Sequence, residues 1–463
     1  MLRIYNSRTR KKEVFKPREG KKVRMFVCGI TPYDFAHIGN FKVFLNYDLL
    51  ARYLAHRGYK VFYLQNVTDV DDKIVNAAKA HNKNWKEIAD HYFNDFLAVC
   101  DALHITSVTT YAKATEHIRD IISQISRLVE KGYAYEQNGS VYFEVNKFKN
   151  YGKLSGQNPA KLHTSVRLAP DANKKHPYDF VLWKAREGID EKYEPSWDSP
   201  WGLGRPGWHI EDTAISEHYF GPQYDIHGGA VELKFPHHEA EIAQAESASG
   251  KKPFVKYWVH AGILMLGKEK MSKSFGNVIT GKQMLAARGQ DAFRFLVAAT
   301  HYRSPIPYSE KLLAQARTNL SRIREFARNL EKVTTKKGIE FSVAPYAKKF
   351  YAKMDDDLNA PAAFAAIFIL MRAAHKLMAK EKLSVDSAHA ILSFLEIIAS
   401  VIGVPLREKE SVIPDRVLTL ANKREKARTE KNWVKADALR AEIEKEGYGI
   451  KDLADGFEII LKR

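Results

Sequence analysis

One stretch near the amino terminus, Met25 to Asn40, constrains the fold of this chain more than any other. It reads M-F-V-C-G-I-T-P-Y-D-F-A-H-I-G-N. The apolar run at its start predicts a short buried strand, and Gly29 and Pro32 predict a turn. Apolar residues at helical spacing follow Gly39. The order strand, loop, helix is typical of a doubly wound parallel sheet, where the loop lies at the carboxyl end of the strand beside the helix amino terminus.

The amino terminus of that helix is a candidate phosphate site. Backbone N–H groups and the helix dipole favour anions there. His37 lies at this terminus, so its imidazole can donate to phosphate oxygens, and Gly39 lets a nucleotide approach the backbone. A single His-x-Gly-x after a strand is more often structural than functional, however. The motif therefore indicates a nucleotide site only together with a second signal.

The second signal is Lys270-Met271-Ser272-Lys273-Ser274, which follows a strand-like apolar run, Gly262 to Leu266. Two lysines on a glycine-rich loop would, alone, more often be a solvated turn. In this order, however, His-Ile-Gly-Asn and Lys-Met-Ser-Lys-Ser resemble the paired signatures of a class I aminoacyl-tRNA synthetase. Chance is a poor explanation for the pair.

Longer strings narrow the assignment further. They are Phe26-Val27-Cys28-Gly29-Ile30-Thr31 with Tyr33-Asp34, Asn66 to Lys73, Gly204 to Glu211, and Phe235-Pro236-His237-His238-Glu239. These strings resemble those of one family, the cysteinyl-tRNA synthetases, and the similarity covers essentially the whole chain. The resemblance implies an α/β fold: a class I Rossmann-like parallel sheet forms a catalytic domain with a connective insertion, followed by an α-helical anticodon-binding bundle and a small C-terminal region.

The pattern of elements and the resemblance together predict three domains. Residues 1–300 form the catalytic domain, and about residues 107–202 form its connective insertion, which the resemblance places toward the tRNA acceptor end. Residues 301–406 read as a helical bundle, with no strand pattern after about Thr300 until the chain end. Residues 407–463 form a basic C-terminal region that resembles the anticodon-contacting region of the family.

The charge balance favours a polyanionic partner. The formal net charge is +18 and the sequence pI is about 9.5, an imbalance suited to neutralising phosphates. General solubility is the simpler explanation, since the basic clusters are scattered along the chain. Charge alone therefore supports a nucleic acid only moderately.

Cysteine usage and hydropathy predict a cytoplasmic protein with no membrane partner. Only Cys28 and Cys100 occur, so no disulfide framework exists and a reducing compartment suits the chain. The amino terminus lacks the apolar core of a signal peptide, and no apolar run approaches the length of a membrane span. Cys100 lies in an apolar helical pattern that indicates packing, whereas Cys28 ends a strand at the catalytic edge.

A metal site is predicted from four residues. His237 and Glu241 have the four-residue spacing that can clamp a metal on one helix face, although an ordinary helical His/Glu pair is the simpler alternative. The family resemblance implies one Zn²⁺ per chain, held by two Cys, one His and one Glu at matching positions. Here those positions are Cys28, Asp212, His237 and Glu241, with Asp212 in place of a cysteine. Because zinc accepts carboxylate oxygen, the site is chemically reasonable, and a weaker zinc site, another metal or none stay open.

The resemblance also implies a two-step reaction. The carboxylate of cysteine attacks the α-phosphate of ATP, which enters with Mg²⁺, and the adenylate then acylates the terminal ribose of the cysteine tRNA. His37, Asn40, Lys270 and Lys273 are predicted to stabilise the developing charge. Gly39, Ser272 and Ser274 are predicted to contact the nucleotide. Asn40 stands where the usual signature has its second histidine, and an amide can still donate to phosphate.

Two alternative functions come from other classes. A ligase could pass activated cysteine to an amino sugar instead of tRNA, as one relative of the family does, and the basic helical C-terminal third argues against that. A tRNA-binding paralogue without catalysis is the other alternative. The intact Lys-Met-Ser-Lys-Ser sequence argues against it.

Overall fold

The computed structural model describes residues 1–157, 171–188, 190–267, 269–271, 278–407, 414–453 and 456–461. The chain divides into two compact units, Met1–Val404 and Pro405–Arg463. Each unit has its own core and is described by itself.

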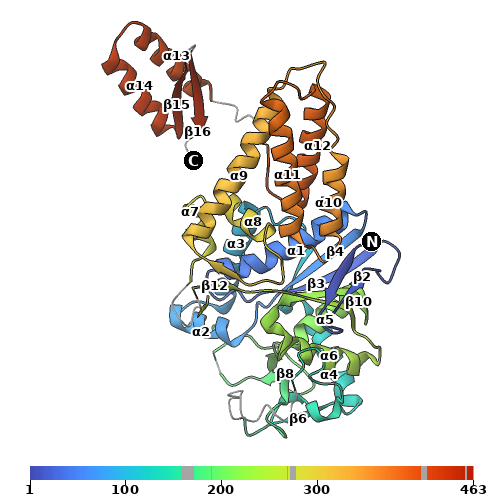
Figure 1. Ribbon diagram of the computed structural model, residues 1–463. Helices are drawn as coiled ribbons and strands as arrows, with labels where there is room; N and C mark the ends of the chain where they lie inside the picture. The colour runs from blue at the N-terminus through green and yellow to red at the C-terminus, as the bar shows by residue number, and fades with distance from the viewer. Residues whose placement is uncertain are drawn as a thin grey trace. The chain divides into compact units, whose positions relative to one another are not determined.

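A five-stranded parallel sheet organises the first unit, as the sequence predicts (Figure 1). Its central strand, β3, is almost wholly buried and ends in the stretch that carries Cys28. In spatial order the strands are β11 (Val255–Ala261), β10 (Tyr224–Ala230), β3 (Lys22–Ile30), β4 (Lys60–Val67) and β5 (Thr110–Lys113).

Helices connect these strands and cover the sheet. The first, α1 (Ile38–His56), begins directly after the loop that follows β3, and fourteen of its residues are buried because it packs between the sheet and the bundle. A hairpin of β1 (Arg3–Asn6) and β2 (Lys11–Val14) packs beside β11. The helices α2 (Asp72–His81) and α3 (Trp85–Ala102) follow β4.

The predicted insertion contains an antiparallel sheet of four strands. After α4 (Ile118–Glu130), β6 (Ala134–Gln137) and β7 (Ser140–Phe143) form an antiparallel hairpin. Two strands that the sequence did not predict complete the sheet, β8 (Phe180–Ala185) and β9 (Gly204–Pro206). β8 begins with an apolar run, Phe180 to Trp183, that was overlooked between polar residues, whereas β9 has only three residues and is defined by its pairing with β8. The helices α5 (Ile210–Phe220) and α6 (His237–Ser249) then return the chain to the parallel sheet.

The remainder of the first unit is mainly helical. A small sheet joins β12 (Leu264–Leu266), β13 (Glu269–Lys270) and β14 (Ile306–Tyr308). The prediction of no strand after Thr300 until the chain end is therefore wrong, because β14 has only three residues and shows no periodicity of its own. The helices are α7 (Gly281–Ala286), α8 (Gln290–Ala298), α9 (Glu310–Glu331), α10 (Ala344–Met354), α11 (Ala360–Met378) and α12 (Val385–Ile402).

Two of these helices, α11 and α12, are long and apolar enough to cross a membrane by length and composition alone. This corrects the expectation that no apolar run approaches that length. In the structure their apolar residues form the core of the bundle, where Leu370, Ile391 and Leu395 are fully buried. The core helix of a water-exposed bundle passes the same test, so the finding is weak support for a membrane segment.

The second unit has two helices and a hairpin. Its helices α13 (Asp415–Thr429) and α14 (Trp433–Lys445) lie in the range predicted as helical, and β15 (Tyr448–Leu453) pairs antiparallel with β16 (Gly456–Leu461). Val417, Ala421 and Ile443 form a small core between them.

A buried ion pair within the parallel-sheet domain also contacts the last helix of the bundle. Asp48 on α1 is fully buried and accepts hydrogen bonds from Arg294 on α8 and from Arg52. Burial raises the pKa of Asp48, but the two arginines outweigh this effect and hold it below its ordinary value. The remaining donors of Arg294 bind the carbonyls of Ile402 at 2.7 Å and Leu103 at 2.6 Å.

We predict that Asp48→Ala destabilises the first unit by about 3–5 kcal/mol, because it leaves a buried guanidinium without its counter-charge. The measurement is thermal unfolding of the full chain followed by circular dichroism. Lys22→Ala, which removes one partner of an exposed ion pair with Glu19, is the control and is expected to leave the melting temperature nearly unchanged. Equal shifts in the two variants would contradict the role given to the Asp48–Arg294 pair.

Candidate active site and metal centre

The first signature lies at the start of α1, as predicted. His37 is the N-cap residue, and its backbone N–H donates to the amide oxygen of Asn40 at 3.1 Å. A Cβ on Gly39 would lie only 2.8 Å from Nδ1 of His37, so glycine is required for the imidazole to lie against the helix start. The structure therefore gives Asn40 a capping role through its oxygen, and its contact with phosphate stays a prediction.

The chain beside the second signature contacts the first. Ile38 N–H donates to the carbonyl of Ile279 at 2.9 Å, and Gly281 N–H donates to the carbonyl of Ala36 at 2.9 Å. Met271 is buried and faces Gly39. The fold thus brings the surroundings of the two signatures together from positions more than two hundred residues apart in the sequence.

The structure describes only part of the second signature. Ser272, Lys273 and Ser274 lie outside the described residues, and only the backbone of Lys270, in β13, is described. The roles assigned to them stay predictions.

The Asp-rich run after β4, Asp69 to Asp72, has a structural role at the start of the next helix. Asp71 caps α2 by accepting from the backbone N–H of Lys73 at 2.8 Å. Asp69 accepts from the hydroxyl of Thr115 at 2.6 Å. These bonds fix the loop beside the carboxyl end of β4.

The structure brings together the four predicted metal-binding residues, which we name the pocket-side cluster: Cys28, Asp212, His237 and Glu241. Their candidate ligand atoms all lie within 4.8 Å of one another. His237 Nε2 is 3.1 Å from Asp212 Oδ2 and 3.1 Å from Glu241 Oε1, and Cys28 Sγ is 3.9 Å from Glu241 Oε1. The residues come from β3, α5 and α6, and all four are buried.

Neighbouring side chains orient these donors. His237 Nδ1 lies 2.7 Å from Nδ1 of His209, which can accept its proton and so leave Nε2 as a lone pair facing the cluster. The other oxygen of Asp212 accepts from the amide nitrogen of Asn66 at 2.6 Å, and the amide oxygen of Asn66 accepts from Gly29 N–H at 2.6 Å. Such partners are typical of metal sites, where they fix ligand orientation.

The electrostatics of the pocket-side cluster suit a cation. Burial, and next the charge of Asp212, raise the pKa of Glu241 well above its ordinary value. Burial also raises the pKa of the Cys28 thiol, with Asp212 and Glu241 adding to the effect. Among the described residues, no lysine or arginine pairs with Asp212 or Glu241. A sulfur, a nitrogen and two carboxylates around one point form a donor set that fits a divalent ion such as zinc.

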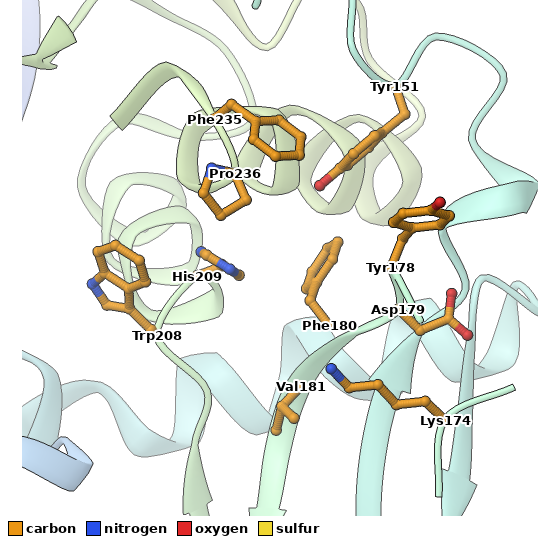
Figure 2. Close-up of a pocket in the computed structure, with 10 residues that line it drawn as sticks. All are labelled: Tyr151, Lys174, Tyr178, Asp179, Phe180, Val181, Trp208, His209, Phe235 and Pro236. Carbon is orange, nitrogen blue, oxygen red and sulfur yellow. The ribbon is translucent and has the colours of Figure 1, made fainter. Parts of the chain in front are cut away.

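A cavity of about 290 Å³ opens beside this cluster. Figure 2 shows its aromatic walls around His209 and Trp208. The Trp208 ring, which lines the cavity, stacks on His237 with centroids 4.2 Å apart, so one ring links the cavity to the metal-binding candidates. Its lining residues are Tyr151, Lys174, Tyr178, Asp179, Phe180, Val181, Trp208, His209, Phe235 and Pro236.

Two histidines near the cluster were not predicted as site residues. His227 on β10 and His238 on α6 also lie close to Cys28 and Glu241, and we name these four the core-side cluster. His238 stands in a string quoted for the family resemblance and His227 does not, and the two are eleven residues apart on different elements. No local spacing signals their convergence.

Comparison with known proteins agrees with this geometry. Residues 14–318 match the family described as the tRNA synthetases class I (C) catalytic domain, and residues 349–407 match the DALR domain. A protein of Thermococcus onnurineus named Cysteine--tRNA ligase is 40% identical over 98% of both chains, and one of that name from Dehalococcoides mccartyi is 42% identical over 98% of both.

Solved structures share the fold. The Mycobacterium tuberculosis methionyl-tRNA synthetase in complex with methionyl-adenylate has a TM-score of 0.60 and 15% identity, covering 82% of this chain and 89% of its own. At that identity the likeness concerns the fold alone. Taken with the near-full-length relatives and the matched catalytic domain, it completes the assignment: this chain belongs to the cysteine--tRNA ligase family of class I aminoacyl-tRNA synthetases.

Proposed function

We propose that this chain ligates cysteine to its tRNA in an ATP-dependent reaction that passes through a cysteinyl adenylate. The observation that carries the proposal is the pocket-side cluster, a buried set of S, N and O donors at the carboxyl end of β3, one loop away from the amino terminus of α1. The ends of parallel strands are where ligands bind in such sheets. Nothing in the structure or the comparisons supports the amino-sugar or non-catalytic alternatives.

In the first step the cysteine carboxylate attacks the α-phosphate of ATP, and pyrophosphate leaves. Phosphoryl chemistry of this kind depends on charge stabilisation and positioning. We assign that role to His37, Lys270 and Lys273, with Asn40 orienting His37 by capping the helix. Gly39, Ser272 and Ser274 are assigned to nucleotide contacts, and Mg²⁺ accompanies ATP.

In the second step a hydroxyl of the terminal ribose of tRNA attacks the carbonyl carbon of the adenylate, an ester forms, and AMP leaves. The aromatic cavity suits the end of the tRNA, since aromatic side chains stack on bases and its β8 wall belongs to the predicted insertion. Its position beside His237 would bring a terminal nucleotide next to the amino-acid site.

Selection of cysteine over serine is the chemical problem that the pocket-side cluster addresses. A pocket without a metal has little to distinguish a thiol from a hydroxyl of similar shape. A zinc ion held there by Cys28, Asp212, His237 and Glu241 would supply a soft acceptor that prefers sulfur. The chain's own contribution is to exclude water from the site and to fix His237 through His209 and Asp212 through Asn66.

The division of labour along the chain is also proposed. Residues 1–300 carry catalysis, with the insertion at about 107–202 facing the acceptor end. The bundle of residues 301–406 and the basic region 407–463 contact the rest of the tRNA. The reaction and its partners fit the cytoplasm, which we propose as the compartment.

The first test of this function substitutes Lys273, the lysine assigned to stabilise the transition state. Lys273→Ala is expected to slow cysteine-dependent exchange of pyrophosphate into ATP by about a hundredfold, in line with the loss of one transition-state donor. Lys251→Ala, at an exposed lysine, is the matched control and should retain the wild-type rate. Unchanged exchange in Lys273→Ala would remove this residue from the mechanism.

A second test concerns Asp212, a carboxylate ligand at the position where the family has a cysteine. Asp212→Cys is expected to tighten zinc binding, because a thiolate bonds zinc more covalently than a carboxylate does. Competition against a chromophoric chelator measures the dissociation constant. An affinity equal to that of the wild type would argue that position 212 does not face the ion.

A third test separates the two steps. Deletion of residues 415–463 is expected to raise the KM for tRNA while sparing pyrophosphate exchange, because the deleted helices and hairpin belong to a separate compact unit. Steady-state aminoacylation and exchange assays on the same preparation make the comparison. If both activities fall equally, the proposed division of labour is wrong.

A further inference from the structure

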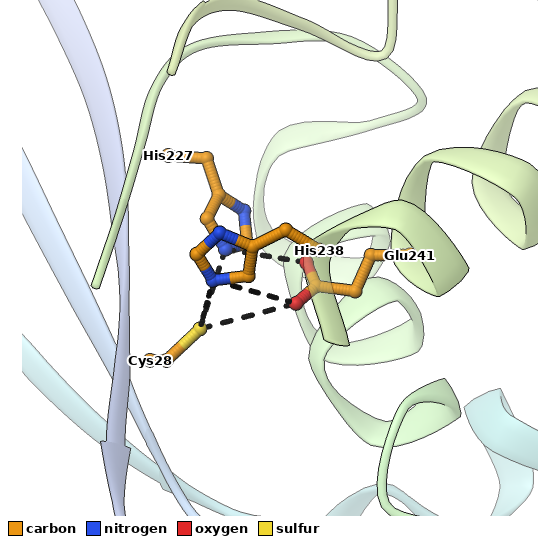
Figure 3. Close-up of side chains that lie close together, drawn as sticks. All are labelled: Cys28, His227, His238 and Glu241. Carbon is orange, nitrogen blue, oxygen red and sulfur yellow. Dashed lines mark hydrogen bonds and ion pairs between the residues drawn. The ribbon is translucent and has the colours of Figure 1, made fainter. Parts of the chain in front are cut away.

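The core-side cluster has the composition and spacing of a metal site in its own right. Figure 3 shows Cys28, His227, His238 and Glu241 converging on one point, with the two imidazole rings directed toward the thiol and the carboxylate. Cys28 Sγ lies 3.3 Å from His227 Nε2 and 3.2 Å from His238 Nε2. Glu241 Oε2 lies 3.2 Å from His227 Nε2, and Glu241 Oε1 lies 3.9 Å from both Cys28 Sγ and His238 Nε2.

These separations match tetrahedral coordination. Zn–S bonds of about 2.3 Å and Zn–N or Zn–O bonds of about 2.0–2.2 Å place the ligand atoms of a tetrahedral zinc site roughly 3.3–3.6 Å apart. Three of the contacts fall at 3.2–3.3 Å and two at 3.9 Å. Small side-chain adjustments therefore suffice to close the site around an ion.

The far nitrogen of each ring has the partner that a metal-binding histidine needs. Nδ1 of His227 lies 2.6 Å from the hydroxyl of Tyr224. Nδ1 of His238 lies 2.8 Å from Nε2 of His260, whose own Nδ1 lies 2.8 Å from the hydroxyl of Ser7. If each Nδ1 carries the proton and donates along these bonds, both Nε2 atoms present lone pairs to the cluster. Such outer partners fix tautomer and ring orientation at metal sites.

The surroundings keep these donors in place and away from solvent. His227 and His238 are both fully buried. The indole of Trp258 stacks on His227 with centroids 4.4 Å apart. A Cβ on Gly229 would lie 3.2 Å from Nε2 of His238, so glycine at that position makes room for the ring.

We propose that the core-side cluster is a second metal position, at which Cys28, His227, His238 and Glu241 hold a divalent ion of the zinc type. Because it shares Cys28 and Glu241 with the pocket-side cluster, one ion occupies one position or the other. In this chain the balance depends on Asp212, a harder ligand than the thiolate the family carries there. The inference goes beyond the proposed function and does not require that the chain activates cysteine.

The two positions differ in what an ion could do. The pocket-side position borders the cavity through His237 and Trp208. Both positions have four buried protein ligands, but the ring that stacks on a core-side ligand, Trp258 on His227, does not line the cavity. Four protein ligands away from a cavity are the pattern of a closed structural site. An ion at the core-side position would therefore stabilise the fold around β3, β10 and α6 without contacting a substrate.

The competing interpretation is a hydrogen-bonded network without a metal. Each ring could carry its proton on Nε2 and donate to Cys28 or Glu241, while Tyr224, His260 and Ser7 donate in the reverse direction. The same distances satisfy both arrangements. Only metal binding separates them.

Asp212 is one of the two ligands that belong only to the pocket-side cluster, so its removal weakens that position and leaves all four core-side ligands in place. Purified Asp212→Ala protein is stripped with a chelator and titrated with Zn²⁺ and Co²⁺ by equilibrium dialysis. We expect it to bind one ion per chain. X-ray absorption at the metal edge should show one sulfur and two imidazole ligands, and the Co²⁺ form should show thiolate-to-metal charge transfer.

A histidine substitution at the core-side cluster is then compared with one at an exposed histidine, both in the Asp212→Ala background. Asp212→Ala/His227→Gln should lose affinity at least about tenfold relative to Asp212→Ala, as expected for a lost ligand or ligand partner. Asp212→Ala/His81→Gln, altered at an exposed histidine, should not. Circular dichroism checks that each variant is folded. If a histidine variant does not fold, the number of imidazole ligands found by X-ray absorption in Asp212→Ala still tests the proposal.

The proposal is overturned if Asp212→Ala binds no ion, or binds one with a single imidazole ligand. It is also overturned if His227→Gln and His81→Gln affect affinity equally. Pyrophosphate exchange by wild-type protein is measured separately. Its absence would count against the proposed function and leave the metal titration unaffected.

Discussion

Burial of negative charge at the carboxyl end of β3 is the constraint on which this site depends. Asp212, Glu241 and the thiol of Cys28 occupy one water-poor volume, and in the described part of the chain the groups that contact their acidic atoms are histidines, an asparagine and one another. Ionised groups are costly to bury unless a counter-charge or a metal compensates them. A divalent ion resolves this cost, whereas proton uptake by Glu241 is the alternative that burial favours.

Three elements of the fold supply the side chains of the pocket-side cluster. Strand β3 presents Cys28, α5 presents Asp212, and α6 presents both its first residue, His237, and Glu241 one turn later. Further from the site, the Asp48–Arg294 pair anchors α1, whose amino terminus carries His37. The nucleotide signature and the candidate metal centre are therefore held by adjacent segments of one sheet, and the bundle is fastened to the same helix.

Much of this arrangement follows from the sequence, and the exceptions have physical reasons. The apolar run before Gly29 and the helical pattern after Gly39 predict the strand–loop–helix unit, because both signals are local. The convergence of Cys28, Asp212, His237 and Glu241 came from the family resemblance, since only the last two share a helix. The pair His227 and His238 was missed because its members meet only through tertiary packing. The three-residue strand β14 and the β15–β16 hairpin were missed because pairing partners, and not periodicity, define them.

The central claim is that a metal ion at the candidate centre lets this chain select a thiol. The most direct measurement compares cysteine with serine in ATP–pyrophosphate exchange, using the same preparation with zinc bound and after removal by a chelator, with circular dichroism to confirm that the fold persists. The account predicts a strong preference for cysteine in the zinc-bound protein and a ratio of kcat/KM values that falls toward unity without the metal, because shape alone separates the two side chains poorly. An undiminished preference in folded, metal-free protein would contradict it.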